Sequence, residues 1–300
     1  MDKIDKIILA ELGNDCRQPL SNIGRRIRKS PQFVKYHLEN LKQSEIKGIP
    51  IITDFYRAGY TEVTALIKFD IIDPLSEKVL IDYLFRMTET YKLLYTNGNY
   101  DIICSFILKD LSELSKIKEE ITKVANVEIK FLVNYQTNIS SLNYLSEKYS
   151  DKNIELKQQK ETMSEPEIKE IVAELHRNPF ASLLEISGKI NSTYDKVKYA
   201  IKKSKLLLGN TIIISERSVQ RAIIFFKIKN KSSFGSYCKL DKNIVETNYL
   251  VGEYDAYIIV ESIENVKQIN KKIIYDLRES VSDYTMLDAN QFYKYGWFGL

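Results

Sequence analysis

The sequence has little of the chemistry on which most enzymes and secreted proteins depend. Its 300 residues include only two histidines, His37 and His176, and three cysteines, Cys16, Cys104 and Cys238. The cysteines are too far apart for a CxxC pair, and an odd number does not make a disulfide framework. Neither histidine has a companion motif for a metal site or a Ser-His-Asp triad. We therefore expect buried cysteines, no metal, no cofactor, no catalytic residues and no enzymatic activity.

Long apolar runs and a secretory leader are also missing. No apolar run approaches the roughly 18 residues that span a bilayer. The first residues, Met1-Asp2-Lys3-Ile4-Asp5, are charged and amphipathic and lack the apolar core of a signal peptide. With 44% hydrophobic and 28% charged residues, the composition is that of an ordinary globular chain. These observations predict a cytoplasmic protein of two or three domains.

The chain repeats itself. Ala10-Glu11-Leu12 and Val34-Lys35-Tyr36 both recur 163 residues later, as Ala173-Glu174-Leu175 and Val197-Lys198-Tyr199. Gly98-Asn99-Tyr100-Asp101 recurs 154 residues later as Gly252-Glu253-Tyr254-Asp255. Three matches in the same order indicate a tandem duplication, in which each copy has a helical front and a strand-rich back.

The front of each copy has the pattern of a helix-turn-helix. In the first copy, apolar residues recur at helical spacing over 4–12, 20–27 and 34–41, and Ser30-Pro31 is a typical start for the third helix. The second copy repeats this plan over 168–175, 183–190 and a helix capped by Thr193. Three short helices with tight turns, the last one long and capped, predict the DNA-binding motif.

The back of each copy has the pattern of a small antiparallel sheet. Residues 63–70 alternate between apolar and polar, the period of a strand with one buried face. A helix over about 75–87, strands over 91–95 and 100–108, a helix over 111–121 and a strand over 127–135 follow, and residues 222–293 repeat the order. The order βαββαβ predicts a ferredoxin-like sheet with both helices on one face.

The expected fold class is therefore α+β, with two winged-type helix-turn-helix domains alternating with two ferredoxin-like domains. The predicted boundaries are 1–48 and 166–209 for the helical domains and 49–145 and 210–300 for the sheet domains. Residues 146–165 are polar and nearly free of large hydrophobic side chains, so we expect a linker there, in part helical.

This layout resembles the leucine-responsive regulatory protein/AsnC (Lrp/AsnC) family of prokaryotic transcription regulators. The resemblance is carried by Asp2-Lys3-Ile4-Asp5, by Ser30-Pro31 and by Gly98-x-Tyr100-Asp101. The family commonly has glycine two residues before the Ser-Pro cap, where this chain has Arg28 and, in the second copy, Asn191. The second copy also lacks the Asp-x-x-Asp opening and has Tyr194 in place of the cap proline.

Positive charge is concentrated on the two helix-turn-helix segments. Residues 17–47 carry a formal charge of +6 and residues 177–205 carry +5, whereas the whole chain is +4, so that the remaining residues sum to −7. Such segregation favours contact with the phosphates of double-stranded DNA over a merely solvated helix face. The candidate DNA-binding residues are Arg25, Arg26, Arg28, Lys29, Ser30, Gln32, Phe33, Lys35 and Tyr36 in the first copy, and Lys189, Lys196, Lys198, Tyr199 and Lys202 in the second.

The two Gly-x-Tyr-Asp turns have two interpretations. They are either simple β-turns in which glycine supplies a positive φ, or, as the resemblance implies, part of a cleft in which backbone amides hold an amino-acid effector. The candidate effector-binding residues are Gly98, Tyr100, Asp101, Gly252, Tyr254 and Asp255.

Two alternative functions remain at this point. Siroheme decarboxylases are similar in layout, but they carry histidine- and arginine-rich signatures in the sheet domain, and both sheet domains of this chain have no histidine. An architectural DNA-binding protein without an effector is the other alternative.

The sequence leaves two alternatives for the assembly of the sheet domains. The resemblance implies dimers formed by paired sheets, so we expect either an intramolecular pseudo-dimer or a homodimer of chains, the latter joined by faces such as that of Ile223 and Phe225.

Overall fold

The computed structural model describes residues 1–300 except 72, 147–149, 151, 159–165, 205 and 297–300. Both helix-turn-helix units predicted from the sequence are present. The first consists of α1 (Lys3–Asn14), α2 (Leu20–Ile27) and α3 (Pro31–Ser44), and the second of α6 (Pro166–Arg177), α7 (Leu183–Lys189) and α8 (Tyr194–Ser204). Among the described residues, no helix is both long and apolar enough to cross a membrane.

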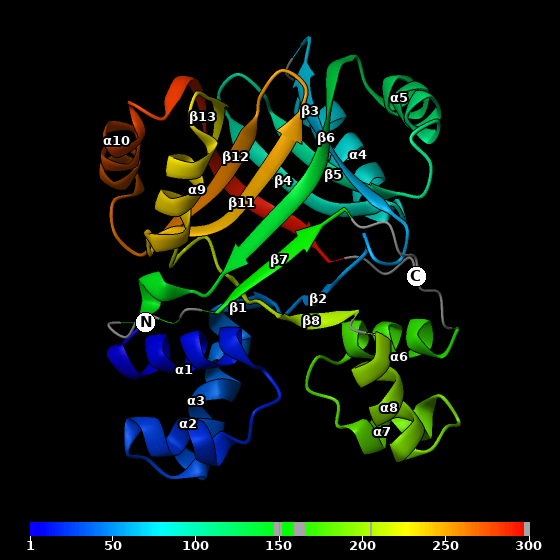
Figure 1. Ribbon diagram of the computed structural model, residues 1–300, viewed down its shortest axis with the longest axis vertical. Coiled ribbons are helices and arrows are strands. Elements are labelled where there is room, and N and C mark those ends of the chain that lie inside the picture. Colours follow the sequence, from blue (N-terminus) through cyan, green and yellow to red (C-terminus); the bar gives the residue numbers. More distant parts are fainter. Residues whose placement is uncertain (72, 147–149, 151, 159–165, 205, 297–300) are drawn as a thin grey trace.

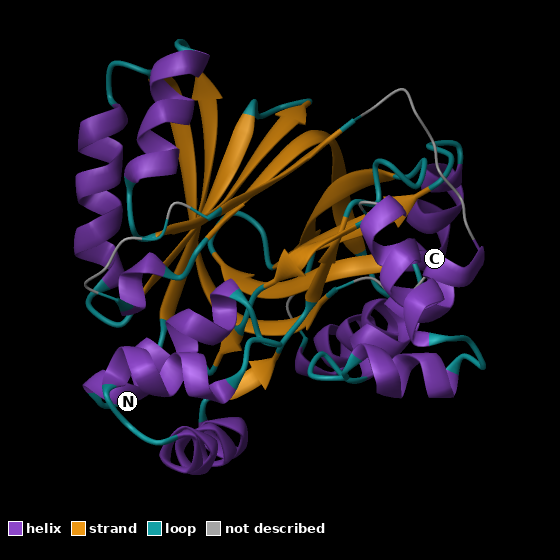
Figure 2. Ribbon diagram, turned by 60° about the horizontal axis from the view of Figure 1, so that its bottom comes forward, coloured by secondary structure: helices purple, strands orange, loops and turns teal. Residues whose placement is uncertain are grey.

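Both βαββαβ units are also confirmed. The first runs through β3 (Thr61–Phe69), α4 (Pro74–Arg86), β4 (Thr90–Asn97), β5 (Ile102–Leu108), α5 (Glu113–Val124) and β6 (Val127–Ser140). The second runs through β10 (Gln220–Ile228), α9 (Lys231–Leu240), β11 (Ile244–Val251), β12 (Ala256–Ser262), α10 (Val266–Leu277) and β13 (Val281–Tyr295). The helices lie outside the strands, as Figure 2 shows, and the predicted α+β class is correct.

The two sheets join edge to edge into a closed ring. β6 of the first copy pairs antiparallel with β11 of the second, and β13 of the second pairs with β4 of the first. In the part of the chain that the structure describes, the hydrogen-bonded order is therefore β3, β6, β11, β12, β10, β13, β4, β5 and back to β3. One chain thus forms the intramolecular pseudo-dimer, and closure leaves no unpaired edge among these eight strands.

Closure buries the face of each sheet that the sequence pattern assigned to solvent. The prediction that β3 has one buried face is wrong, since Thr64 is as fully buried as its neighbours Val63 and Ala65. The apolar face packs under α4 and α5, and the other face points into the ring. For the same reason Ile223 and Phe225 do not form a surface that joins two chains, because both are buried in the ring interior with no exposed area.

The segments around the ring also differ from the prediction. Residues 153–157 of the expected linker form β7 (Asn153–Lys157), which pairs with β6, and Ile154 and Leu156 alternate inward between exposed neighbours. The helix expected in this linker is therefore not found in its described part, and the short 3-10 turn η1 (Asn143–Leu145) lies just before it. The rest of the linker, residues 147–149, 151 and 159–165, lies outside the described residues.

Short strands after each helix-turn-helix unit pair with each other across the two copies. β1 (Ile46–Gly48) pairs with β9 (Ile213–Ile214), and β2 (Ile51–Thr53) pairs with β8 (Leu207–Asn210), all antiparallel. The two helical units are therefore joined by these two short strand pairs, β1–β9 and β2–β8, which together we call the ribbon. Figure 1 shows both units on the same side of the ring, with α1–α3 next to α6–α8.

A buried ion pair crosses the ring between equivalent positions of the two copies. Lys92 and Glu246 are each the third residue of their strands, β4 and β11, and each lies six residues before its repeat glycine. Their side chains form an ion pair, and Lys92 Nζ also lies 3.2 Å from Glu62 Oε1. Equivalent residues that touch must lie next to the pseudo-twofold axis.

Hydrogen bonds complete this buried network. Glu246 accepts from Tyr295 Oη at 2.8 Å and from Asn248 Nδ2 at 2.6 Å, and Thr137 Oγ1 donates to Glu62 at 3.3 Å. Burial alone lowers the pKa of Lys92, but Glu246 and Glu62 outweigh it and hold that pKa well above its ordinary value. Burial raises the pKa of Glu62. The lysine therefore stays charged, and its partners come from both copies.

We predict that charge reversal at Lys92 and Glu246 distinguishes a stabilising ion pair from two side chains that are merely buried. Lys92→Glu places like charges together in the interior and should cost about 3–5 kcal/mol, which lowers the melting temperature by roughly 10 °C. Lys92→Glu combined with Glu246→Lys should recover only part of that loss, because Glu62 still lies beside position 92, and calorimetry on the full chain measures the recovery. Additive losses in the double variant would contradict the pairing.

Candidate DNA-binding surface

The turn between α2 and α3 has the geometry of a helix-turn-helix. Arg28 ends α2 in the left-handed conformation (φ 56°, ψ 46°), and Asn191 has the same conformation in the second copy (φ 51°). A Cβ on Gly24 would lie only 2.6 Å from the Lys29 carbonyl oxygen, so the turn requires glycine there. Both left-handed positions are those where the related family has glycine.

Side-chain caps start both recognition helices. Ser30 Oγ accepts a hydrogen bond from the Phe33 amide at 3.2 Å, and Pro31 is the first helical residue. In the second copy Thr193 Oγ1 accepts from the Lys196 amide at 3.3 Å. Both predicted caps are confirmed, and each fixes which side chains begin the helix.

The candidate DNA-binding side chains are exposed, with one exception. Phe33 is half-buried, and Lys29 Nζ lies 5.3 Å from its ring centroid. Tyr36 and Tyr199, which are equivalent in the repeat, are 67% and 64% exposed. The other exposed candidates are Arg25, Arg26, Arg28, Lys29, Ser30, Gln32 and Lys35 in the first unit and Lys189, Lys196, Lys198 and Lys202 in the second.

Two of these cations also hold their own unit together. Arg26 on α2 pairs with Glu11 on α1, and the equivalent Lys189 pairs with Glu174 at 2.9 Å. Glu174 pairs with Arg177 as well, and these cations hold its pKa below its ordinary value. Arg26 and Lys189 therefore brace the first helix against the second, and part of their charge is already compensated.

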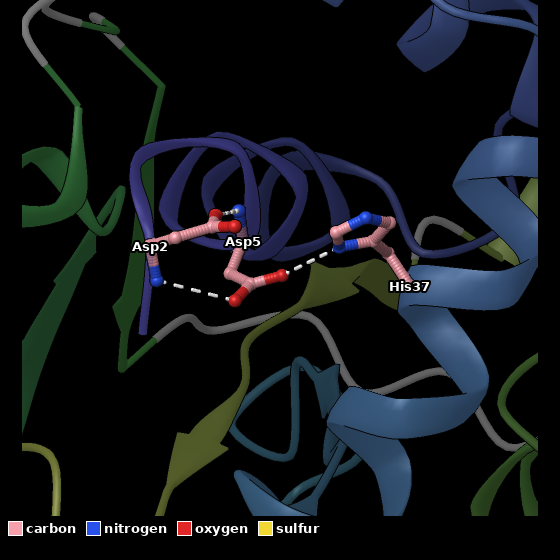
Figure 3. A group of neighbouring side chains, drawn as sticks. All are labelled: Asp2, Asp5 and His37. Carbon is pink, nitrogen blue, oxygen red and sulfur yellow. Dashed lines mark hydrogen bonds and ion pairs between the residues drawn. The ribbon is translucent and has the colours of Figure 1, made fainter.

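The first recognition helix has a polar link that the second lacks. His37 Nδ1 on α3 lies 2.8 Å from Asp5 Oδ1 on α1, as Figure 3 shows. The equivalent residues of the second unit, Ala200 and Ile168, are buried in an apolar cluster. The sequence pattern did not reveal this link between α3 and α1.

Asp2, Asp5 and His37 lie close enough to be considered as a metal site. The Asp2 side chain accepts from the Asp5 amide at 2.7 Å, and the Asp5 side chain accepts from the Asp2 amide at 3.2 Å. This reciprocal capping box and the histidine bond account for the arrangement without an ion.

Contacts of the first helical unit with β8 and with the second helical unit supplement the strand pairing of the ribbon. Cys16 is buried after α1, and its amide donates to Asn210 Oδ1 at 3.0 Å. Asn210 Nδ2 in turn donates to the Leu12 carbonyl at 2.7 Å. Lys42 Nζ on α3 lies 4.5 Å from the Phe180 ring centroid in the α6–α7 loop. The two recognition helices are thus placed relative to one another by contacts within one chain.

The buried positions of the other two cysteines also match the prediction. Burial raises the pKa of the Cys16 thiol to about 11 and those of Cys104 and Cys238 to about 12. All three therefore stay protonated near neutral pH and act as small apolar side chains.

The Gly-x-Tyr-Asp turns are interface turns of the ring. Gly98 (φ 142°) and Gly252 (φ 148°) have the positive φ expected of β-turn glycines. A Cβ on Gly98 would lie 2.7 Å from Leu287 Cδ2, and one on Gly252 would lie 2.6 Å from Leu132 Cδ2. Each turn therefore packs against the last strand of the other copy.

The aspartates of these turns already have partners. Asp101 Oδ2 accepts from the Phe69 amide at 2.8 Å, and Asp255 Oδ2 accepts from the Ile228 amide at 2.8 Å. Tyr100 and Tyr254 are buried in the ring core. These contacts, with the close packing of Gly98 and Gly252, give all six effector candidates a structural role, and effector binding there stays a prediction.

Comparisons with known proteins place the chain among regulators. No protein-family model matches it. It is 32% identical over 134 residues to the HTH-type transcriptional regulator Ptr1 of Methanocaldococcus jannaschii, which covers 42% of this chain and 86% of that protein. It is 28% identical over 118 residues to the regulatory protein AsnC of Haemophilus influenzae, which covers 39% and 78%. Each match is about as long as one copy.

A solved structure matches the fold of the whole chain. The siroheme decarboxylase NirDL superposes with a TM-score of 0.61 at 15% identity, covering 98% of this chain and 93% of that one. At this identity the likeness concerns the arrangement of four domains alone. The sequence matches and the duplicated domain order lead to one assignment. The chain belongs to the Lrp/AsnC family of HTH-type transcriptional regulators, and it carries the family's helical and sheet domains twice.

Proposed function

We propose that the chain is a sequence-specific transcriptional regulator that binds double-stranded DNA with both helix-turn-helix units. The observation that carries this proposal is the pair of exposed basic recognition surfaces on one side of a closed ring (Figure 1). Phosphates attract such surfaces, and the ribbon and the Cys16 contacts keep the two units in one arrangement. The relatives' names support the same function.

The conformation and charge of Arg28 support the proposed DNA contact. A non-glycine residue in the left-handed region costs on the order of 1–2 kcal/mol. The chain keeps an exposed arginine at this position, whereas Asn191 adopts the same conformation in the second unit without charge. We infer that the positive charge of Arg28 contacts phosphate at the turn, where it sets the position of the helix without reading bases.

The two recognition helices present different side chains to the bases. In the first unit Gln32 suits adenine, Phe33 a thymine methyl group, and Lys35 guanine or phosphate. In the second unit the equivalent residues are Asp195, Lys196 and Lys198. Asp195 suits the amino group of cytosine but is repelled by phosphates. One chain therefore offers two unlike readers.

We predict that two variants, Gln32→Ala and Arg28→Asn, distinguish base reading from phosphate contact. Gln32→Ala should weaken the free energy of binding to the preferred duplex by about 1–3 kcal/mol and leave binding to random DNA unchanged. Arg28→Asn keeps the left-handed turn and should weaken binding to both duplexes equally. The slope of log K against log salt concentration should fall by about 1. Fluorescence anisotropy at several salt concentrations measures both. Lys118→Ala, on exposed α5, is the matched control. Equal losses on both duplexes for Gln32→Ala would contradict base reading.

We favour a regulator over an enzyme of the siroheme decarboxylase kind. The sheet domains, residues 49–145 and 210–300, have no histidine. The interior of the ring is filled by buried side chains, among them Phe225 and Tyr257. We therefore predict that adding siroheme leaves its Soret band unshifted, and a saturable shift would contradict the assignment.

The proposal also covers regulation by an effector and assembly of chains into a homodimer. An amino-acid effector at the Gly98 and Gly252 turns would bind next to the joint between the copies, where it can bias how the ring holds the helical units. An architectural role without effector is the alternative. A homodimer of chains would use the outer surface, since the faces inside the ring are already paired.

A further inference from the structure

A large cavity separates the first helix-turn-helix unit from the ring. It has a volume of about 1120 Å³, ample for a small organic molecule. One wall is a face of α1, where Lys3, Ile7, Ala10 and Asn14 follow at helical spacing. The opposite wall comes from residues 141–146, which follow β6, and from Lys242 and Glu264 of the second sheet domain.

The lining of this cavity is amphipathic with an excess of positive charge. Five basic side chains line it, against three acidic ones, so that its net charge is +2. Glu11 is paired with Arg26, which leaves Asp15 and Glu264 as the remaining acids. Ile7, Ala10 and Ile263 add apolar surface. An occupant that satisfies this lining has an apolar body and an anionic group.

Both walls connect to the DNA-binding surface. Asn14 at the end of α1 accepts from Ser141 Oγ at 2.8 Å, which ties α1 to the connecting segment. Asp5 on α1 holds His37 on the recognition helix, and Arg26 lines the cavity next to the α2–α3 turn. A molecule that bridges α1 and Lys242 would therefore act on the first recognition helix through existing contacts.

We propose that this cavity binds a small amphiphilic anion and that its occupation weakens DNA binding by the first helix-turn-helix unit. The negative charge would sit beside Arg26 and reduce the positive potential that attracts phosphates. The regulatory half of this proposal rests on the proposed DNA-binding function, and the binding half does not. The site is distinct from the Gly-x-Tyr-Asp turns, because none of their residues lines the cavity.

The binding half is tested with 8-anilinonaphthalene-1-sulfonate as a fluorescent anion and neutral N-phenyl-1-naphthylamine as its uncharged counterpart. We expect saturable binding of the anion to the full chain, with the neutral probe at least about tenfold weaker. Lys242→Ala, an exposed loop change, should raise the Kd of the anion about tenfold, and Ala10→Trp, which fills the cavity, should abolish binding. Lys118→Ala should change nothing. An unchanged Kd in both Lys242→Ala and Ala10→Trp would overturn the site.

The regulatory half is tested by DNA anisotropy with and without the anionic probe. We expect a saturating probe to weaken DNA binding by wild type about fivefold or more, and not to affect Ala10→Trp. Probe binding that leaves the DNA affinity of wild type unchanged would overturn the regulatory half. If the chain binds no DNA at all, the proposed function fails, while the fluorescence titration still decides whether the cavity binds an anion.

Discussion

The ion pair between Lys92 and Glu246 joins the two copies inside the ring that the β6–β11 and β13–β4 pairings close. The two residues are equivalent in the repeat and meet at the pseudo-twofold axis, so a pair of identical copies would place lysine against lysine or glutamate against glutamate. Buried like charges are costly, whereas a buried pair roughly offsets its own desolvation. We interpret the pair as a device that selects partners: the first sheet domain fits the second and disfavours another copy of itself.

Closure of the ring determines where the DNA-binding units lie. Once β6 pairs with β11 and β13 with β4, the strands that connect each helical unit to its sheet run side by side and pair as β1 with β9 and β2 with β8. The first helical unit then contacts Asn210 on β8 through Cys16, and it contacts the second helical unit through Lys42 and Phe180. Two unlike recognition helices therefore form one asymmetric surface in a single chain.

Local patterns predicted the elements, but not the contacts between copies. The caps Ser30 and Thr193 follow from a few neighbouring residues, and both are found. The buried face of Thr64 and the partners of Lys92 depend on a sheet 150 residues away, which periodicity along one strand does not report. β7 was a local miss, because Ile154 and Leu156 alternate with polar residues as a strand requires. A charged side chain inside an otherwise apolar strand, as at Lys92, was the available signal for the network.

The most direct test of the account is the DNA motif that the intact chain selects from random duplexes, combined with the mass of the complex by light scattering. One chain with two unlike readers should select an asymmetric motif whose halves differ, and one chain should occupy each duplex. A perfect palindrome bound by a single chain would contradict the account, because one chain has no two identical recognition helices to place on identical half-sites.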